Sequence, residues 1–151
     1  MKQIFGFTLI ELLVVMAILA ILSTLGINSF MSSQMKARDA QRKSDLTQIS
    51  KALELYYNDN EQYPATLPNG AVWQNGATMY IKQVPVDPRF DNYFYEPLVT
   101  NGVRNGYYLF ARLENINDPS YIAAGFGGRH CPSTSTVLCN YYVSSTNAPN
   151  L

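Results

Sequence analysis

Hydrophobic and polar positions divide the chain into three stretches of different character. Residues 7–31 are almost uninterruptedly apolar, and Glu11 is the single charged residue among them. A helix over this range would measure roughly 37 Å, which is enough to cross a hydrocarbon core of about 30 Å. The stretch therefore predicts a transmembrane helix, with weaker helix formers and a soft point at Gly26 between residues 21 and 29.

The pattern changes at residues 32–60, where apolar side chains recur at three- and four-residue spacing. Leu46, Ile49 and Leu53, followed by Tyr56 or Tyr57, form one stripe. This spacing predicts an amphipathic continuation of the helix whose stripe seats a globular head. We interpret the remaining faces as solvated or facing a neighbouring subunit; their charged residues are Lys36, Arg38, Asp39, Arg42, Lys43, Asp45, Lys51 and Glu54.

Beyond the expected helix end at residues 58–60, the pattern switches to alternation. Asn-Gly pairs and prolines separate short runs that are rich in tyrosine and valine, as in antiparallel strands. We expect residues 65–78 to form a surface connection and the 106–114 strand to be buried on one face. The predicted strands are 93–96, 106–114 and 140–145, with a fourth candidate at 121–125. The predicted fold class is α+β: a long N-terminal helix packs against a small antiparallel sheet, and residues 61–151 form a globular head that contains this sheet and a C-terminal loop.

Glu11 is an unusual residue within an apolar segment. An ionised carboxylate in a membrane costs several kcal/mol unless it finds a partner or a proton. Residues 1–6 form a short leader that ends in Gly6, and cleavage after Gly6 would leave Phe7 with a free amine. That amine is the cation that Glu11 needs.

Gly6 followed by Phe7-Thr8-Leu9-Ile10-Glu11 resembles the class III signal of type IV pilins and type II secretion pseudopilins. The resemblance implies that a prepilin peptidase cuts after Gly6 and methylates Phe7, and that Glu11 pairs with the Phe7 amine of a neighbouring subunit. The Tyr63-Pro64 and Asp87-Pro88 segments also resemble this family, and the second pattern is typical of major pseudopilins.

Composition and cysteine content narrow the remaining possibilities. Lysine plus arginine and aspartate plus glutamate number 11 each, so net charge gives no argument for nucleic acid. Cys131 and Cys139 are the two cysteines, and in an exported chain they indicate one disulfide; two free thiols are the alternative. No phosphate-binding or dinucleotide motif is present, and His130 is the single histidine. We expect neither an enzyme nor a cofactor.

One loop resembles a metal site. Oxygen-rich loops after this strand bind calcium in pseudopilins, and residues 114–118 carry Glu114, Asn115, Asn117 and Asp118. This loop is poorer in glycine and aspartate than the calcium-binding loop of pseudopilins. A turn without a metal ion explains these residues equally well. We therefore assign no metal ligand.

The resemblance implies a polymerising structural subunit. The main hypothesis is a type IV pilus subunit for adhesion, motility or DNA uptake; the alternatives are a type II secretion pseudopilin and a non-polymerising anchored binding protein. The implied partners are further copies of the chain, the peptidase and an inner-membrane assembly machinery. The implied location is the inner membrane with the head outside, and then an extracellular filament, although the basic residues after residue 35 point the other way.

Overall fold

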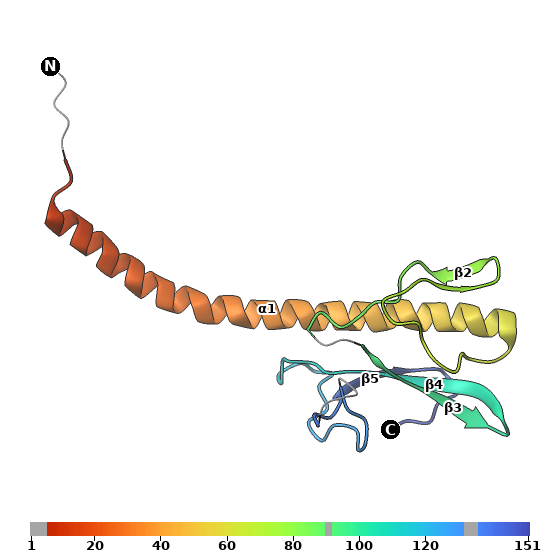
Figure 1. The fold of residues 1–151 in the computed structure, drawn as a ribbon. Helices are drawn as coiled ribbons and strands as arrows, with labels where there is room; N and C mark the ends of the chain where they lie inside the picture. The colour runs from red at the N-terminus through yellow and green to blue at the C-terminus, as the bar shows by residue number, and fades with distance from the viewer. Residues whose placement is uncertain (1–5, 90–91, 132–135) are drawn as a thin grey trace. The chain divides into compact units, whose positions relative to one another are not determined.

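The structure is a computed structural model that describes residues 6–89, 92–131 and 136–151, without the side chains of residues 24–26 and 28. Its contacts divide the chain into two compact units, one up to Met35 and one from Lys36 to Leu151. The described residues form one helix and five strands: α1 (Leu9–Asn60), β1 (Trp73–Asn75), β2 (Thr78–Ile81), β3 (Phe94–Thr100), β4 (Val103–Ala111) and β5 (Tyr141–Ser144) (Figure 1). The predicted α+β fold with a long N-terminal helix is confirmed.

Residues 21–29, which the sequence marks as a soft segment, are helical. The poor helix formers of this segment predict that it is helical in a membrane and partly extended in a filament, and the second half of this expectation stays a prediction. The helix ends as expected at Asn60. Glu61 follows with a φ of 54° and donates its backbone N–H to the Tyr57 carbonyl at 2.8 Å, which closes the last turn.

The second half of α1 packs with one face on the head, as the stripe predicts. Leu46, Ile49 and Leu53 are fully buried. They belong to a core that also contains Tyr107 and Leu109 from the sheet. The helix is therefore held by burial of this stripe, which is the main source of stability for a helix in a small domain.

Strands β3, β4 and β5 form one antiparallel sheet in that order. Each of them overlaps one of the strands predicted at residues 93–96, 106–114 and 140–145. Leu109 in the central strand lies opposite Tyr95 of β3 and Val143 of β5. The expectation that this strand is buried on one face is wrong. Tyr108 and Phe110 belong to a second core cluster on the opposite face from Leu109.

The chain after β4 covers that opposite face. Phe126, Cys131 and Cys139 pack with Phe110 in the second cluster, so the central strand β4 is buried on both faces from Gly106 to Ala111. The strand that we predicted at residues 121–125 is absent, and turns occupy the segment. Gly125 has a φ of 61°, and a Cβ there would come within 2.8 Å of the Leu138 Cβ.

Residues 65–78 are more than a surface connection, because they contain β1 and lead into an antiparallel hairpin with β2. The Trp73 ring is buried and stacks on Tyr56 of α1 at 5.3 Å between centroids. Tyr80 from β2 contacts the same Tyr56 ring edge-on at 5.1 Å. This aromatic contact attaches the hairpin to the helix.

Candidate functional site

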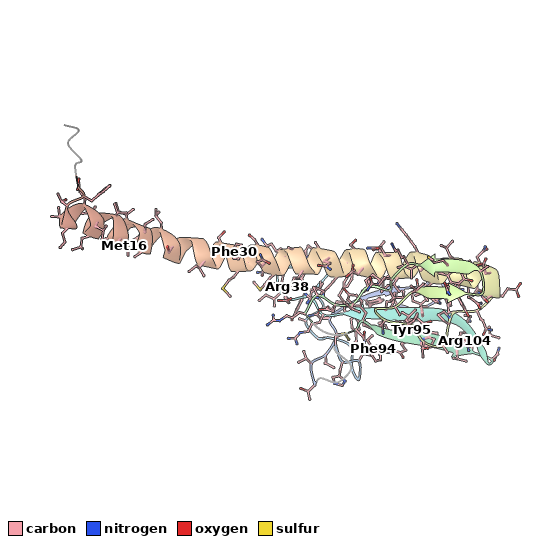
Figure 2. The ribbon with its side chains drawn as sticks, turned by 45° about the horizontal axis from the view of Figure 1, so that its top comes forward. Met16, Phe30, Arg38, Phe94, Tyr95 and Arg104 are labelled. Atoms are coloured by element: carbon pink, nitrogen blue, oxygen red, sulfur yellow. A yellow bond between two sulfur atoms is a disulfide. The ribbon has the colours of Figure 1, made fainter. Side chains whose placement is uncertain are left out.

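The N-terminal unit presents apolar side chains on its surface. Met16 and Phe30, labelled in Figure 2, are 63% and 64% exposed. The large apolar residues of the first part of α1 with exposed side chains are Leu9, Ile10, Leu12, Leu13, Val14, Val15, Met16, Ile18, Leu19, Ile21, Leu22, Ile27, Phe30 and Met31. An apolar surface of this extent marks a region that contacts a partner or a lipid phase.

Glu11 is held by the start of its own helix. Its Oε2 accepts hydrogen bonds from the Thr8 backbone N–H at 2.8 Å and from the Thr8 hydroxyl at 2.7 Å. The Thr8 hydroxyl oxygen in turn lies 3.3 Å from the Glu11 backbone N–H, which donates to it. This is a capping box, in which threonine and a glutamate three residues later satisfy each other's backbone N–H groups.

The sequence analysis missed this capping box, although the Thr-x-x-Glu spacing is its signature.

Phe7 and Glu11 line one shallow hollow together with Ile10, Val14 and Val15. Gly6 is exposed and Phe7 is 86% exposed, so the Gly6–Phe7 bond is accessible to a peptidase. Pairing of Glu11 with a neighbour's amine stays a prediction.

Within the part of the chain that the structure describes, no helix combines the length and the apolar character that a membrane span needs.

The second unit contains a buried ion cluster centred on Arg42, whose side chain has no exposed surface. Its Nε and Nη2 donate to the two carboxylate oxygens of Asp87 at 2.7 and 3.0 Å. Its Nη1 donates to Asp39 and to Glu114, both at 2.8 Å. Arg42 thus joins α1, the turn before β3 and the loop after β4.

Neighbouring basic residues complete the cluster. Arg38 donates from Nε and Nη2 to both oxygens of Glu114, at 2.8 and 2.7 Å, and Arg89 reaches the same carboxylate at 3.0 Å. Lys43 donates to Asp118 at 2.6 Å. The interpretation of these charges as a solvated or subunit-facing surface is therefore wrong for Asp39, Arg42 and Asp45, which are buried in the head.

The contacts within this cluster shift the pKa values of Glu114 and Arg42. The hydrogen bonds from Arg38, and then those from Arg42, outweigh burial and lower the pKa of Glu114 from 4.5 to about 2. Burial lowers the pKa of Arg42. The hydrogen bonds to Asp87 and Glu114 raise it by more than that, so the pKa is higher than that of a free arginine. Both groups are charged throughout the physiological range.

The calcium loop suggested by the resemblance does not fit these residues. Both Glu114 oxygens accept from arginines, and the Asp118 Oδ1 accepts from Lys43 and from the Ser120 backbone N–H. The Asn115 Oδ1 accepts from the Asn117 backbone N–H at 3.2 Å. No group of three or more acidic, histidine or cysteine side chains in the described residues could hold a metal ion.

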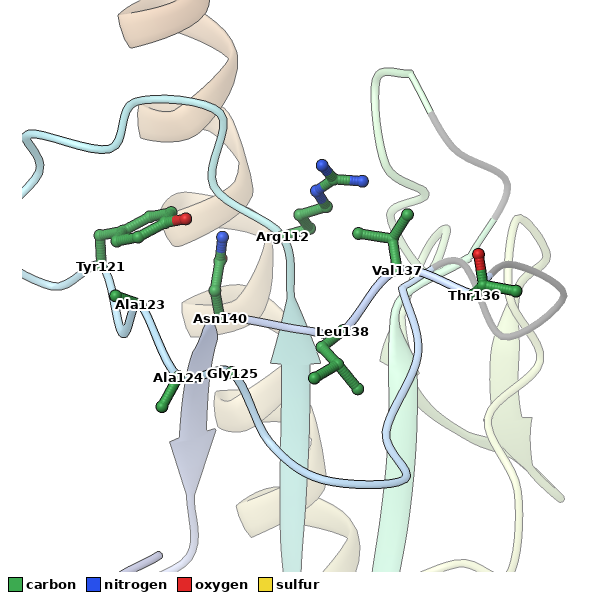
Figure 3. Close-up of a pocket in the computed structure, with 9 residues that line it drawn as sticks. All are labelled: Arg112, Tyr121, Ala123, Ala124, Gly125, Thr136, Val137, Leu138 and Asn140. Carbon is green, nitrogen blue, oxygen red and sulfur yellow. The ribbon is translucent and has the colours of Figure 1, made fainter.

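Cys131 and Cys139 form a disulfide, as expected from the sequence, and no free cysteine remains among the described residues. Beside it lies a hollow of about 360 Å³ (Figure 3). Asn140 in its wall exchanges two hydrogen bonds with the Leu113 backbone, at 2.7 and 3.0 Å. Its described lining contains no carboxylate, histidine or thiol: Arg112, Tyr121, Ala123, Ala124, Gly125, Thr136, Val137, Leu138 and Asn140.

Two family models match the chain. The first, described as a prokaryotic N-terminal methylation motif, covers residues 1–27. The second, described as type II secretion system protein G, covers residues 29–110, more than half of the chain. The chain belongs to the type II secretion system protein G family. The resemblance to type IV pilins and pseudopilins is thereby confirmed.

Several similar proteins carry the name type II secretion system core protein G, and three of them illustrate the range. The protein of Pseudomonas aeruginosa is 35% identical over 73% of this chain and 85% of its own length. That of Escherichia coli K12 is 33% identical over 70% of this chain and 79% of its own. That of Vibrio cholerae is 31% identical over 63% and 72%. No solved structure matches the chain significantly.

Family membership favours one of the three functions that the sequence left open. The protein G family is named for type II secretion, which agrees with the pseudopilin alternative better than with the type IV pilus of the main hypothesis. The matched region ends at Phe110, so the disulfide segment lies outside it.

Proposed function

We propose that the chain is a pseudopilin that polymerises through its N-terminal helix into the filament of a type II secretion system. It acts as a structural subunit and not as an enzyme. Its partners are further copies of itself, a prepilin peptidase, the inner-membrane secretion machinery and the membrane.

One observation carries this proposal most strongly. The large apolar side chains of α1 before Met35 are half to four-fifths exposed, as at Val15 (50%) and Leu9 (81%). Exposed apolar surface costs about 25 cal/mol for each Å² left in water. Lipid covers such a helix before assembly, and equivalent helices of other subunits cover it within a filament.

The methylation motif supports the proposed processing. The peptidase cuts after Gly6, and the exposed Phe7 receives the methyl group. Residues 7–31 then anchor the chain in the inner membrane until assembly. Glu11 leaves its Thr8 partner or shares it, and pairs with the Phe7 amine of the next subunit in an apolar setting where the attraction is strong.

A type IV pilus subunit is the second candidate. The C-terminal disulfide loop between Cys131 and Cys139 resembles the arrangement in pilins and lies beyond the matched protein G region. In that case the filament would extend from the cell surface and serve adhesion, motility or DNA uptake.

Mass spectrometry of two cell fractions separates these functions. The proposal predicts a mature chain beginning at methylated Phe7 in the cell envelope and little in material sheared from the cell surface. Abundant mature chain in the sheared fraction would replace the pseudopilin by a pilus subunit. A chain that still begins at Met1 would contradict both and leave a plain anchored protein.

A further inference from the structure

The Arg42 cluster lies where the family resemblance places calcium, and its charges are already balanced. Four basic side chains, Arg38, Arg42, Lys43 and Arg89, form ion pairs with four carboxylates, Asp39, Asp87, Glu114 and Asp118. A divalent cation placed among them would add two positive charges to a neutral set. It would also have to displace arginine donors from Glu114.

We propose that Arg42 takes the place of a bound metal ion in this head, so that the fold and its assembly require no calcium. The inference concerns the stability of the head and holds whether the filament serves secretion or a pilus.

The geometry shows how a guanidinium can do this work. A bound cation cross-links segments that are distant in the sequence by attracting their oxygen ligands. Arg42 does the same with hydrogen bonds of 2.7 to 3.0 Å, to Asp39 on its own helix and to two distant segments through Asp87 and Glu114. Its planar fork bonds both oxygens of Asp87, a geometry that lysine could not reproduce.

Asp39 extends this link to the backbone of the loop. Its Oδ1 lies 2.9 Å from the Glu114 backbone N–H, and its Oδ2 lies 2.8 Å from the Asn115 N–H. Arg42 fixes the Asp39 carboxylate, and Asp39 in turn fixes the first two residues of the loop. The loop after β4 is therefore attached to α1 through its own backbone N–H groups and through Glu114 and Asp118.

The test measures thermal unfolding of the full mature chain in detergent micelles, with EDTA and with 1 mM CaCl₂. We expect melting temperatures that agree within about 1 °C, and no bound calcium in equilibrium dialysis. A structural site with micromolar affinity would contribute about 4 kcal/mol at this concentration and raise the melting temperature by more than about 10 °C. Such a rise, or one calcium bound per chain, would overturn the proposal.

Arg42→Ala tests whether Arg42 itself holds these segments together. Removal of the shared donor takes the Arg42 cation away from Asp39 and Asp87, while Glu114 keeps Arg38 and Arg89, and we expect the melting temperature to fall by at least about 10 °C. Because Asp39 and Asp87 have then lost the Arg42 cation between them, CaCl₂ should restore part of the loss in this variant alone. An Arg42→Ala chain as stable as the wild type would contradict the role.

Two further variants keep the test informative if Arg42→Ala fails to fold. Arg38→Gln removes a cation whose side chain is 28% exposed, and a fall of a few degrees that calcium does not alter supports the proposal. A calcium-dependent recovery in Arg38→Gln would overturn it. Lys51→Gln is the matched control, because Lys51 is exposed on the same helix, and its melting temperature should equal that of the wild type.

Discussion

The two units of this chain place apolar and charged side chains in opposite ways. Up to Met35, leucines such as Leu19 are 52% exposed on the surface of α1. From Lys36 onward, the charged Asp39 and Arg42 lie inside the head, at 2% and 0% exposure. The head pairs its buried Asp39 and Arg42 with other charged groups, whereas the N-terminal unit exposes its large apolar side chains. The difference agrees with the proposal that the first unit contacts lipid or other subunits, while the second holds the hydrophobic core.

Leucine truncation should affect the two units differently. Leu53→Ala removes a fully buried side chain and should destabilise the head by about 3 kcal/mol, because it leaves a cavity. Leu19→Ala, which changes the same side chain at an exposed position, should alter head stability by less than about 0.5 kcal/mol. Denaturant unfolding of the full chain in detergent, followed by tyrosine fluorescence, measures both. Equal losses would remove the distinction between the units.

Acid should destabilise the head through its internal charges. The pKa of Glu114 is lowered to about 2 by Arg38 and Arg42, below its usual value near 4.3 in an unfolded chain. The unfolded state therefore binds more protons between these values. The stabilisation, about 3 kcal/mol, is present above pH 5 and is lost as the pH falls toward 2. Lys43 lowers the pKa of Asp118 in the same direction, while burial raises that of Asp45 and opposes the effect.

Denaturant midpoints at pH 7, 5 and 3 check this acid sensitivity. Glu114→Gln should be less stable than the wild type at pH 7 and should approach it near pH 2, where the wild-type carboxylate is protonated too. Parallel curves for the two proteins over the whole range would contradict the assignment to Glu114.

The disulfide should contribute slightly less to the free energy of unfolding than the Glu114 ion pairs do. Its loop from Cys131 to Cys139 closes a short segment, and the chain-entropy model gives about 2.5 kcal/mol. The double variant Cys131→Ser, Cys139→Ser should lose this amount in denaturant unfolding and become insensitive to dithiothreitol. The reduced wild type is the control, and its midpoint should match that of the variant.

Periodic features of the sequence predicted the long helix and the C-terminal strand well. The stripe at Leu46, Ile49 and Leu53 and the helix end at Asn60 are in the structure, because burial on one face imposes helical spacing. The strand near the C-terminus was expected at residues 140–145 and lies at Tyr141–Ser144.

Features that depend on distant segments were missed. Arg42 has the sequence context of a surface residue, and its burial requires Asp87 and Glu114, which lie far along the chain. Tyr108 and Phe110 are buried because the segment after residue 120 covers them, which alternation cannot reveal. In contrast, the Thr8–Glu11 capping box is local, and its four-residue signature was readable from the sequence.

The central claim is that the exposed N-terminal helix exists to polymerise, with Glu11 as the residue that pairs subunits. Chemical cross-linking of membranes from cells that express the wild type, Glu11→Ala or Glu11→Leu tests it most directly. We predict a ladder of multimers for the wild type, and for both variants a membrane-inserted monomer that still begins at methylated Phe7. A wild-type ladder from either variant would contradict the account.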